Sequence, residues 1–203
     1  FASLSIQKNN FSFENLQFPS LTIDLINQKK KLMELKVDSS LRSLAICPGA
    51  EFGPSKKWPP EFYAEVAKAY VKDGWNVLCL GSPNDHETGK QIESINNLDQ
   101  ERRFYNLIGK TSLNDAIDIL ELCEKVVTND SGLMHVAAAV GTPLVALYGP
   151  SSPEYTPPLI DNKKILRKMD GYEKIREGNA EEGYHQSLLA IKPNEVINAL
   201  EEL

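Results

Sequence analysis

The chain has 203 residues, of which 41% are hydrophobic, and 22 lysines and arginines against 28 aspartates and glutamates give it a net charge of −6. This composition is typical of a globular protein, and the length suits one sizeable domain with about forty residues of appendage. The mild acidic excess and the scattered lysines and arginines argue against a dedicated nucleic-acid binder, because neutralising phosphates requires a basic face. The sequence contains no run of eighteen apolar residues, so it predicts no membrane-spanning helix.

The first forty residues differ in pattern from the rest of the chain. Residues 1–23 are rich in Asn, Ser and Phe without a sustained period, which predicts a connector. The sequence starts at Phe1 without an initiator methionine or a signal-like segment, so we expect a chain that lacks an upstream part. Residues 24–37 predict an amphipathic helix, with the lysines at 29–31 on a solvated face.

From residue 43 onward, short apolar runs alternate with helical stretches. This alternation predicts an α/β fold, a parallel sheet with helices on both faces and right-handed crossovers. The strands are continuous apolar runs, as expected where both faces of a sheet are covered. The predicted strands are 44–47, 76–80, 104–107, 126–128, 144–147 and 164–167, and the predicted helices are 60–72, 85–97, 113–123, 133–140 and 193–203.

The three cysteines, Cys47, Cys79 and Cys123, are odd in number, far apart and set in apolar segments. This pattern predicts reduced core thiols and a reducing, cytoplasmic compartment. Neither the cysteines nor the three histidines fall at metal-ligand spacing, so we expect no metal site. The sequence also lacks the glycine fingerprint of a dinucleotide-binding fold, which disfavours an NAD dehydrogenase. It contains no complete P-loop either.

In a parallel sheet of this kind, ligands bind where loops leave the carboxyl ends of the strands. The search for a site therefore narrows to a few loops. In one of them, Ser112 and Asp115 have the spacing of a helix cap. The loops are 48–58, 81–87, 108–112, 129–135 and 148–156.

The loop at 129–135 ends a strand and opens a helix, whose first N–H groups lack intrahelical partners and attract anions. Gly132 would let an anion approach the backbone, and Ser131 would cap the helix or donate its hydroxyl. His135, four residues after Ser131, is expected on the same helix face. A capped helix with a buried histidine explains the residues equally well, although Asp130 favours a ligand site.

The loop at 47–59 contains two glycines, several prolines and two adjacent lysines. Gly49 and Ala50 are small enough to bring backbone amides to a ligand, and Lys56 would neutralise phosphate as a mobile point charge. Trp58 would anchor the loop to the following helix. Taken alone, this loop is explained better as a rigid turn with solvated lysines. The polar stretch 171–188 is either a substrate-facing loop or a solvated wrap, and its spacing does not decide between them.

Several strings in the sequence resemble the heptosyltransferases of glycosyltransferase family nine. They are CPGAEFGP at 47–54, KWP at 57–59, TNDSGLMHVAAA at 128–139, LVALYGPSSP at 144–153 and GYHQSL at 183–188. The resemblance covers about residues 41–203 and implies the C-terminal half of a two-domain GT-B enzyme, a Rossmann-like domain that binds a nucleotide sugar. It implies that residues 1–40 are the interdomain connector and the remnant of a missing N-terminal domain.

The resemblance also implies roles for individual residues. Lys56 and His135 would stabilise the departing diphosphate, and the glutamate in the loop after the second strand would contact the ribose. The turn at 107–109 would border the adenine. The implied donor-binding residues are Gly49, Ala50, Glu51, Lys56, Glu87, Ile108, Asp130, Ser131, Gly132 and His135.

The implied reaction is the inverting transfer of L-glycero-D-manno-heptose from ADP-heptose to the first heptose of the lipopolysaccharide inner core, without a metal or cofactor. The catalytic base would belong to the missing N-terminal domain, so we expect this chain to bind donor and to transfer poorly or not at all. The lipid-linked acceptor allows a peripheral contact with the inner membrane. The alternatives are another heptosyltransferase, a sugar-nucleotide epimerase of the same fold, or a non-catalytic nucleotide-sugar-binding module.

Overall fold

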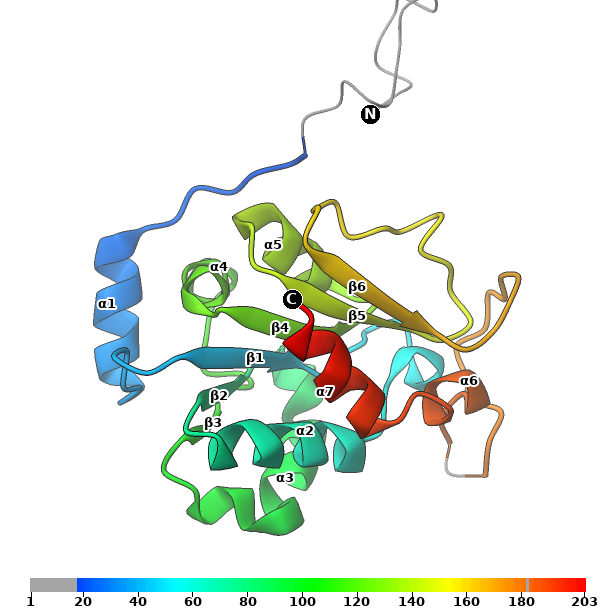
Figure 1. The fold of residues 1–203 in the computed structure, drawn as a ribbon, viewed down its shortest axis with the longest axis horizontal. Helices are drawn as coiled ribbons and strands as arrows, with labels where there is room; N and C mark the ends of the chain where they lie inside the picture. The colour runs from blue at the N-terminus through cyan, green and yellow to red at the C-terminus, as the bar shows by residue number, and fades with distance from the viewer. Residues whose placement is uncertain (1–17, 182) are drawn as a thin grey trace, which may run out of the picture.

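The computed structural model describes residues 18–181 and 183–203, so most of the predicted connector at 1–23 lies outside the described residues. One sheet lies between two layers of helices (Figure 1). Its strands are β1 (Ser43–Cys47), β2 (Asn76–Cys79), β3 (Phe104–Asn106), β4 (Lys125–Asn129), β5 (Leu144–Tyr148) and β6 (Lys163–Arg167). The α-helices are α1 (Leu25–Glu34), α2 (Pro60–Lys72), α3 (His86–Ser94), α4 (Leu113–Leu122), α5 (Gly132–Val140), α6 (Gln186–Leu189) and α7 (Pro193–Glu201).

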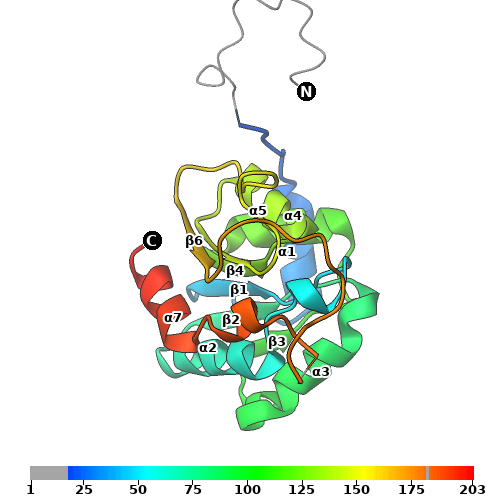
Figure 2. The same ribbon diagram turned by 90° about the vertical axis from the view of Figure 1, so that its right-hand side faces the viewer.

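The six strands lie in the order β3-β2-β1-β4-β5-β6, and every neighbouring pair is parallel. This confirms the predicted parallel sheet. The chain winds outward from β1 in one direction and from β4 in the other, so the loops after these two strands diverge and leave a crevice between them. Figure 2 shows the molecule from the side of the carboxyl ends of the strands.

The residues of β1 show why helices cover both faces of the sheet. All five are buried, and successive side chains point to opposite faces. Leu44 and Ile46 belong to a core formed with α2, α3 and α7. Ala45 and Cys47 belong to a second core that includes residues of α1, α4 and α5. The prediction of helices on both faces is therefore confirmed.

Two helical segments differ from the sequence prediction. The helix predicted at 85–97 ends at Ser94 and continues as the 3-10 helix Ile95–Gln100, because Ile95 takes an extended backbone (ψ 137°) and Asn97 a left-handed one (φ 55°). Helix α6 was not predicted, because a helix of four residues is too short to show a period.

Helix α1 confirms the helix predicted at 24–37 and packs on α4 through the buried Leu32. The lysines at 29 and 30 are exposed, as predicted. Lys31 differs, because its ammonium lies 3.4 Å from the Asp115 carboxylate on α4. The first forty residues thus contribute part of the folded body.

The predicted cap of Ser112 and Asp115 is present at the start of α4. The Ser112 N–H donates to Asp115 at 2.9 Å, and the Asp115 N–H donates to the Ser112 hydroxyl at 3.2 Å. Asn27 of α1 donates to the same carboxylate at 3.1 Å. Burial alone would raise the pKa of Asp115, but the bonds from Ser112 and Asn27 and the charge of Lys31 lower this pKa to about 2.

We expect Asp115→Asn to lower the free energy of unfolding at neutral pH. The difference from wild type should shrink as the pH falls from about 4 to about 2. A carboxyl whose pKa is lowered on folding stabilises the native state above its unfolded pKa, and this contribution disappears as the folded carboxyl is protonated. Urea unfolding of both proteins across this range measures the difference. Asp170→Asn, at an exposed position, is the control. A difference that is constant with pH would contradict the assignment.

All three cysteines are unpaired and buried, which confirms the predicted core thiols. Burial raises the pKa of each thiol, so they remain protonated. Within residues 18–181 and 183–203, no helix is long and apolar enough to cross a membrane.

Candidate functional site

A pocket of about 380 Å³ opens at the carboxyl ends of the strands, where the topology predicts a ligand site. Residues of four of the loops singled out from the sequence meet there. The residues that line the pocket are Gly49, Ala50, Glu51, Gly81, Ser82, Pro83, Asp85, Thr111, Ser112, Leu113, Ala116, Ser131, Gly132 and Leu133.

The start of α5 forms one wall of this pocket. Ser131 is the N-cap residue with an extended backbone (φ −146°), and its hydroxyl makes no capping hydrogen bond within the described part of the chain. A Cβ atom added to Gly132 would meet no described atom within 4 Å apart from its chain neighbours and the backbone of its own helix. The first N–H groups of α5 and the Ser131 hydroxyl therefore border open space, an arrangement that suits an anion such as a phosphate.

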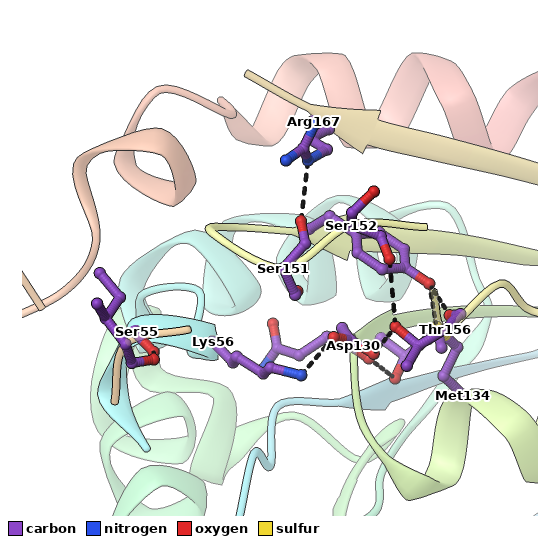
Figure 3. Close-up of polar contacts among 12 residues, drawn as sticks. Ser55, Lys56, Asp130, Met134, Ser151, Ser152, Thr156 and Arg167 are labelled. Atoms are coloured by element: carbon purple, nitrogen blue, oxygen red, sulfur yellow. Dashed lines mark hydrogen bonds and ion pairs between the residues drawn. The ribbon is translucent and has the colours of Figure 1, made fainter. Parts of the chain in front are cut away.

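Lys56 and Asp130 form an ion pair beside this wall (Figure 3). Lys56 Nζ lies 2.5 Å from Asp130 Oδ2, and the Thr156 hydroxyl donates to Asp130 Oδ1 at 3.2 Å. The side chains of Lys56 and Asp130 are only 18% and 4% exposed. Asp130 therefore holds the Lys56 ammonium in this structure, and the neutralisation of phosphate by Lys56 stays a prediction.

The loop after β5 is fixed against the same ion pair. The Tyr148 hydroxyl donates to the Thr156 carbonyl at 2.5 Å and lies 3.4 Å from the sulfur of Met134 on α5. Burial and the nearby Asp130 carboxylate raise the pKa of Tyr148, so the phenol stays protonated and remains a donor. Residues 149–156 are thereby tied to the start of α5.

Asn129, the last residue of β4, joins the loop after β1 to the sheet. Its side chain is fully buried and donates to the Pro48 carbonyl at 2.7 Å. Its amide oxygen accepts from the Trp58 N–H at 3.2 Å and the Tyr63 hydroxyl at 3.0 Å. Trp58 is also fully buried and packs against the Tyr63 ring, so its predicted role as the anchor of this loop is confirmed.

The polar stretch 171–188 lies against the loop after β1. The Ser55 N–H donates to the Arg176 carbonyl at 3.0 Å, and the Ser55 hydroxyl donates to the Ile175 carbonyl at 2.6 Å. Gly53 has φ 137°, and a Cβ atom there would lie 2.6 Å from the Arg176 oxygen. Only glycine fits this close approach of two backbones. Residues 175 and 176 of this stretch are therefore packed onto a loop of the site, and its predicted role, substrate-facing or solvated, stays open.

The structure separates His135 from Ser131. His135 is exposed and lines another groove, of about 270 Å³, with Pro19, Leu21 and Leu159 among its other residues. Ser131 lines the pocket at the strand ends. The prediction that the two share a helix face is wrong, because Ser131 precedes the first helical residue and the four-residue spacing of a helix does not apply to it.

Two other expected donor contacts lie away from the pocket lining. Glu87, which the predicted loop 81–87 and the predicted helix 85–97 share, lies in the first turn of α3, and its carboxylate accepts from the Gln91 amide at 3.4 Å. Ile108 is buried, with its side chain against Gly81 and Gly89. The backbone of the turn around Ile108 remains close to the site, whereas its side chain serves the core.

Asp85 is a pocket residue that the sequence reasoning missed. Its carboxylate accepts from the Ser82 N–H at 3.0 Å and the Ser82 hydroxyl at 2.8 Å. A Cβ atom on Gly49 would lie 2.6 Å from this carboxylate. Glycine at this position therefore leaves the space that the Asp85 carboxylate occupies. The serine three residues before an aspartate is the signal that would have located this cap.

The doubly wound parallel sheet, with the start of α5 at its switch point, defines a Rossmann-like α/β domain. The profile of "Glycosyltransferase family 9 (heptosyltransferase)" matches residues 4–185. The chain belongs to this family.

Close relatives are heptosyltransferases. The chain is 45% identical over 188 residues to lipopolysaccharide heptosyltransferase 2 of Escherichia coli K12, covering 93% of this chain and 54% of the relative. It is 45% identical over 192 residues to lipooligosaccharide heptosyltransferase 2 of Haemophilus influenzae, covering 91% and 55%. The solved structure of E. coli ADP-heptose lps heptosyltransferase II superposes with a TM-score of 0.83 at 42% identity, covering 92% and 54%. The chain thus spans about half the length of the curated relatives it matches.

Proposed function

We propose that this chain is the donor-binding half of an enzyme that transfers L-glycero-D-manno-heptose from ADP-heptose to the first heptose of the lipopolysaccharide inner core. The observation that carries the proposal is the open start of α5, where Ser131 and Gly132 border a pocket at the switch point of the sheet. The identity to lipopolysaccharide heptosyltransferase 2 supports the choice of sugar and acceptor.

In the proposed inverting reaction, an acceptor hydroxyl loses its proton to a base and attacks the anomeric carbon, while the bond to the diphosphate breaks on the opposite face. Negative charge grows on the departing ADP. The N–H groups at the start of α5 and the Ser131 hydroxyl would stabilise this charge electrostatically, without a metal or cofactor. We assign the base to the half that the relatives have in addition to the matched region.

The Lys56–Asp130 pair suggests a more specific role than a single phosphate contact. Because the Asp130 carboxylate is nearly buried, its negative charge beside the diphosphate is offset by the Lys56 ammonium. The carboxylate oxygens of Asp130 have further lone pairs, which would accept hydrogen bonds from hydroxyls of the sugar. Glu51 lines the pocket and would contact the donor, whereas Glu87, Ile108 and His135 remain predicted contacts. The lipid-linked acceptor would place the enzyme at the surface of the inner membrane.

Calorimetric titration tests donor binding. We expect the chain to bind ADP and ADP-heptose and to bind UDP-glucose much more weakly. Addition of the acceptor and of the upstream half of a relative should restore transfer if the base lies there. Absence of ADP binding would overturn the proposal. Binding without transfer in the restored protein would favour a non-catalytic module, and C2 inversion of a sugar nucleotide would favour an epimerase.

Gly132→Ala should weaken ADP binding without weakening the fold. The added methyl group meets no described atom beyond its chain neighbours and the backbone of its own helix, and it takes up space at a residue that lines the pocket. We expect affinity to fall about tenfold, equivalent to about 1.4 kcal/mol, and the free energy of unfolding to stay equal or rise by about 0.5 kcal/mol.

Gly141→Ala, at the other end of α5, is the matched control. Gly141 has φ 85°, a left-handed conformation that alanine tolerates poorly. This variant should lower stability by about 1 kcal/mol and leave ADP affinity unchanged. Equal affinities for ADP in wild type and Gly132→Ala, measured by calorimetry, would contradict the site assignment.

A further inference from the structure

His185 is a buried histidine near the end of the stretch 171–188, and the donor site does not use it. It is the N-cap residue of α6, and only 3% of its surface is exposed. Its Nδ1 atom lies 2.6 Å from the Ser187 hydroxyl oxygen and 3.3 Å from the Ser187 backbone nitrogen. The Nδ1 side of the ring is therefore occupied by the first turn of α6, while the Nε2 side faces earlier parts of the stretch.

The Nε2 atom of His185 faces the side-chain amide of Asn179, with 3.2 Å between Nε2 and Nδ2. Asn179 Oδ1 accepts from the Gln186 N–H at 2.8 Å, so the NH2 group is the end of the amide that points to the ring. A neutral ring fits this arrangement, because its Nε2 accepts from the amide while its Nδ1 shares a hydrogen with the Ser187 hydroxyl. An imidazolium has a hydrogen on both nitrogens, so protonation of His185 places two donors against each other.

An acceptor for the protonated ring lies nearby. Glu173 Oε2 is 3.9 Å from His185 Nε2, which is beyond hydrogen-bond distance, and the Glu173 side chain is 54% exposed. A cavity of about 440 Å³ borders both side chains, so they have room to approach each other. Among the described residues that line this cavity, Lys168 is the only other charged one, and its ammonium lies 2.5 Å from Glu195 of α7. Glu173 is therefore the group to which a charged ring would turn.

The two protonation states of His185 are separated by pH. Burial lowers the pKa of His185 below its ordinary value, and the Glu173 carboxylate opposes this shift only in part. The ring is therefore neutral at pH 7, and it becomes charged only below the ordinary histidine pKa of about 6.5.

The two partners of Nε2 belong to differently anchored parts of the stretch. The Glu173 N–H donates to the Pro150 carbonyl at 2.9 Å, in the loop after β5. Asn179 belongs to a turn in which the N–H groups of Asn179 and Ala180 both donate to the Tyr184 carbonyl at 3.0 Å. A change of partner would thus move His185 from this turn to the segment that is tied to the loop after β5.

We propose that His185 is an acid-sensitive latch with two partners. The neutral ring accepts from Asn179 and holds the turn that contains Asn179 onto the start of α6. The protonated ring leaves Asn179 and donates to Glu173, which frees the turn. None of these residues lines the donor pocket, so the latch does not depend on the proposed function.

Hydrogen exchange of the folded chain, followed by NMR between about pH 7.5 and about pH 5, tests the latch. The informative amides are those of Gln186, which donates to Asn179 Oδ1, and of Ala180, which donates to the Tyr184 carbonyl. After correction for the intrinsic pH dependence of exchange, their protection should fall at least about fivefold over this range. The His185 ring should titrate at a lower pH than a histidine in an unstructured peptide.

Asn179→Asp separates a latch from a merely structural contact. The new carboxylate can still accept from the Gln186 N–H, but it presents an oxygen to His185 Nε2, so it should raise the pKa of His185 and keep the Gln186 amide protected in acid. Asn162→Asp, the same change at an exposed position, is the matched control and should leave the His185 titration unchanged. Glu173→Gln removes the charge that favours the protonated ring, so protection should be lost at a lower pH than in wild type.

Three results would overturn the latch. One is protection of the Gln186 amide that stays constant from about pH 7.5 to about pH 5 in wild type. Another is a His185 titration that is the same in Asn179→Asp, Glu173→Gln and wild type. The third is an equal loss of protection in the central strands β1 and β4, because the acid effect would then be global unfolding rather than the opening of one turn.

Discussion

Lys56→Met is expected to lower the free energy of unfolding by about 3 kcal/mol, because it leaves a nearly buried carboxylate without its cation. The Asp130 side chain is only 4% exposed, and apart from Lys56 the structure gives this carboxylate a hydrogen bond from the uncharged Thr156. Methionine fills a similar volume, so the loss reflects charge rather than packing. Urea unfolding measured at pH 7 gives the value.

Adding Asp130→Asn to Lys56→Met should recover much of this loss, because the unpaired charge disappears with its partner. Lys164→Met is the matched control. It breaks an ion pair with Glu202 whose members are 39% and 65% exposed, and it should change stability by less than about 1 kcal/mol. If Lys56→Met and Lys164→Met lower the free energy of unfolding equally, the Lys56–Asp130 pair behaves as a surface interaction. The proposed electrostatic role of Asp130 is then contradicted.

Asn129→Ala is expected to reduce stability by about 3 kcal/mol and to weaken ADP binding as well. The truncation removes the acceptor of the buried backbone N–H of Trp58 and the donor to the Pro48 carbonyl. Each buried polar group left without a partner lowers the free energy of unfolding by about 1–3 kcal/mol. These two groups lie at the two ends of the loop that brings Gly49 and Ala50 to the pocket. Loss of both bonds releases the loop from β4.

Asn76→Ala provides the control for the Asn129 variant. Asn76 is also fully buried, and its amide donates to the Asp38 carbonyl at 2.7 Å, at the amino ends of the strands. This variant should lose stability yet bind ADP as wild type does at a temperature where both are folded. Equal ADP affinities in Asn129→Ala and Asn76→Ala would show that the loop after β1 keeps its place without Asn129.

The strands and the site loops were predictable because the patterns that encode them are local. A run such as Leu44–Cys47 is apolar at every position, which indicates a strand with both faces covered, and the alternation with helices fixes a parallel sheet. A parallel sheet binds ligands at its carboxyl ends, so the loops followed from the topology. The pocket lies among four of the loops chosen in this way.

The partners of individual side chains were not predictable, because no local pattern encodes them. Lys56 and Asp130 are 74 residues apart, and their pairing follows from the adjacency of β1 and β4 together with the path of the loop between Pro48 and Trp58. The placement of His135 failed for a different reason. A shift of one residue in where α5 begins decides whether Ser131 obeys helical spacing, and helix ends are the least certain part of any sequence prediction.

The contact between Gly53 and the Arg176 carbonyl has a consequence for which positions tolerate substitution. The bond from the Ser55 N–H to the same carbonyl also runs between main-chain atoms, so it does not depend on which side chain occupies position 176. A change of the side chain at position 176 can therefore alter the local charge while the backbone contact stays in place. Gly53 is the partner that has to remain glycine, because any side chain there would meet the Arg176 carbonyl.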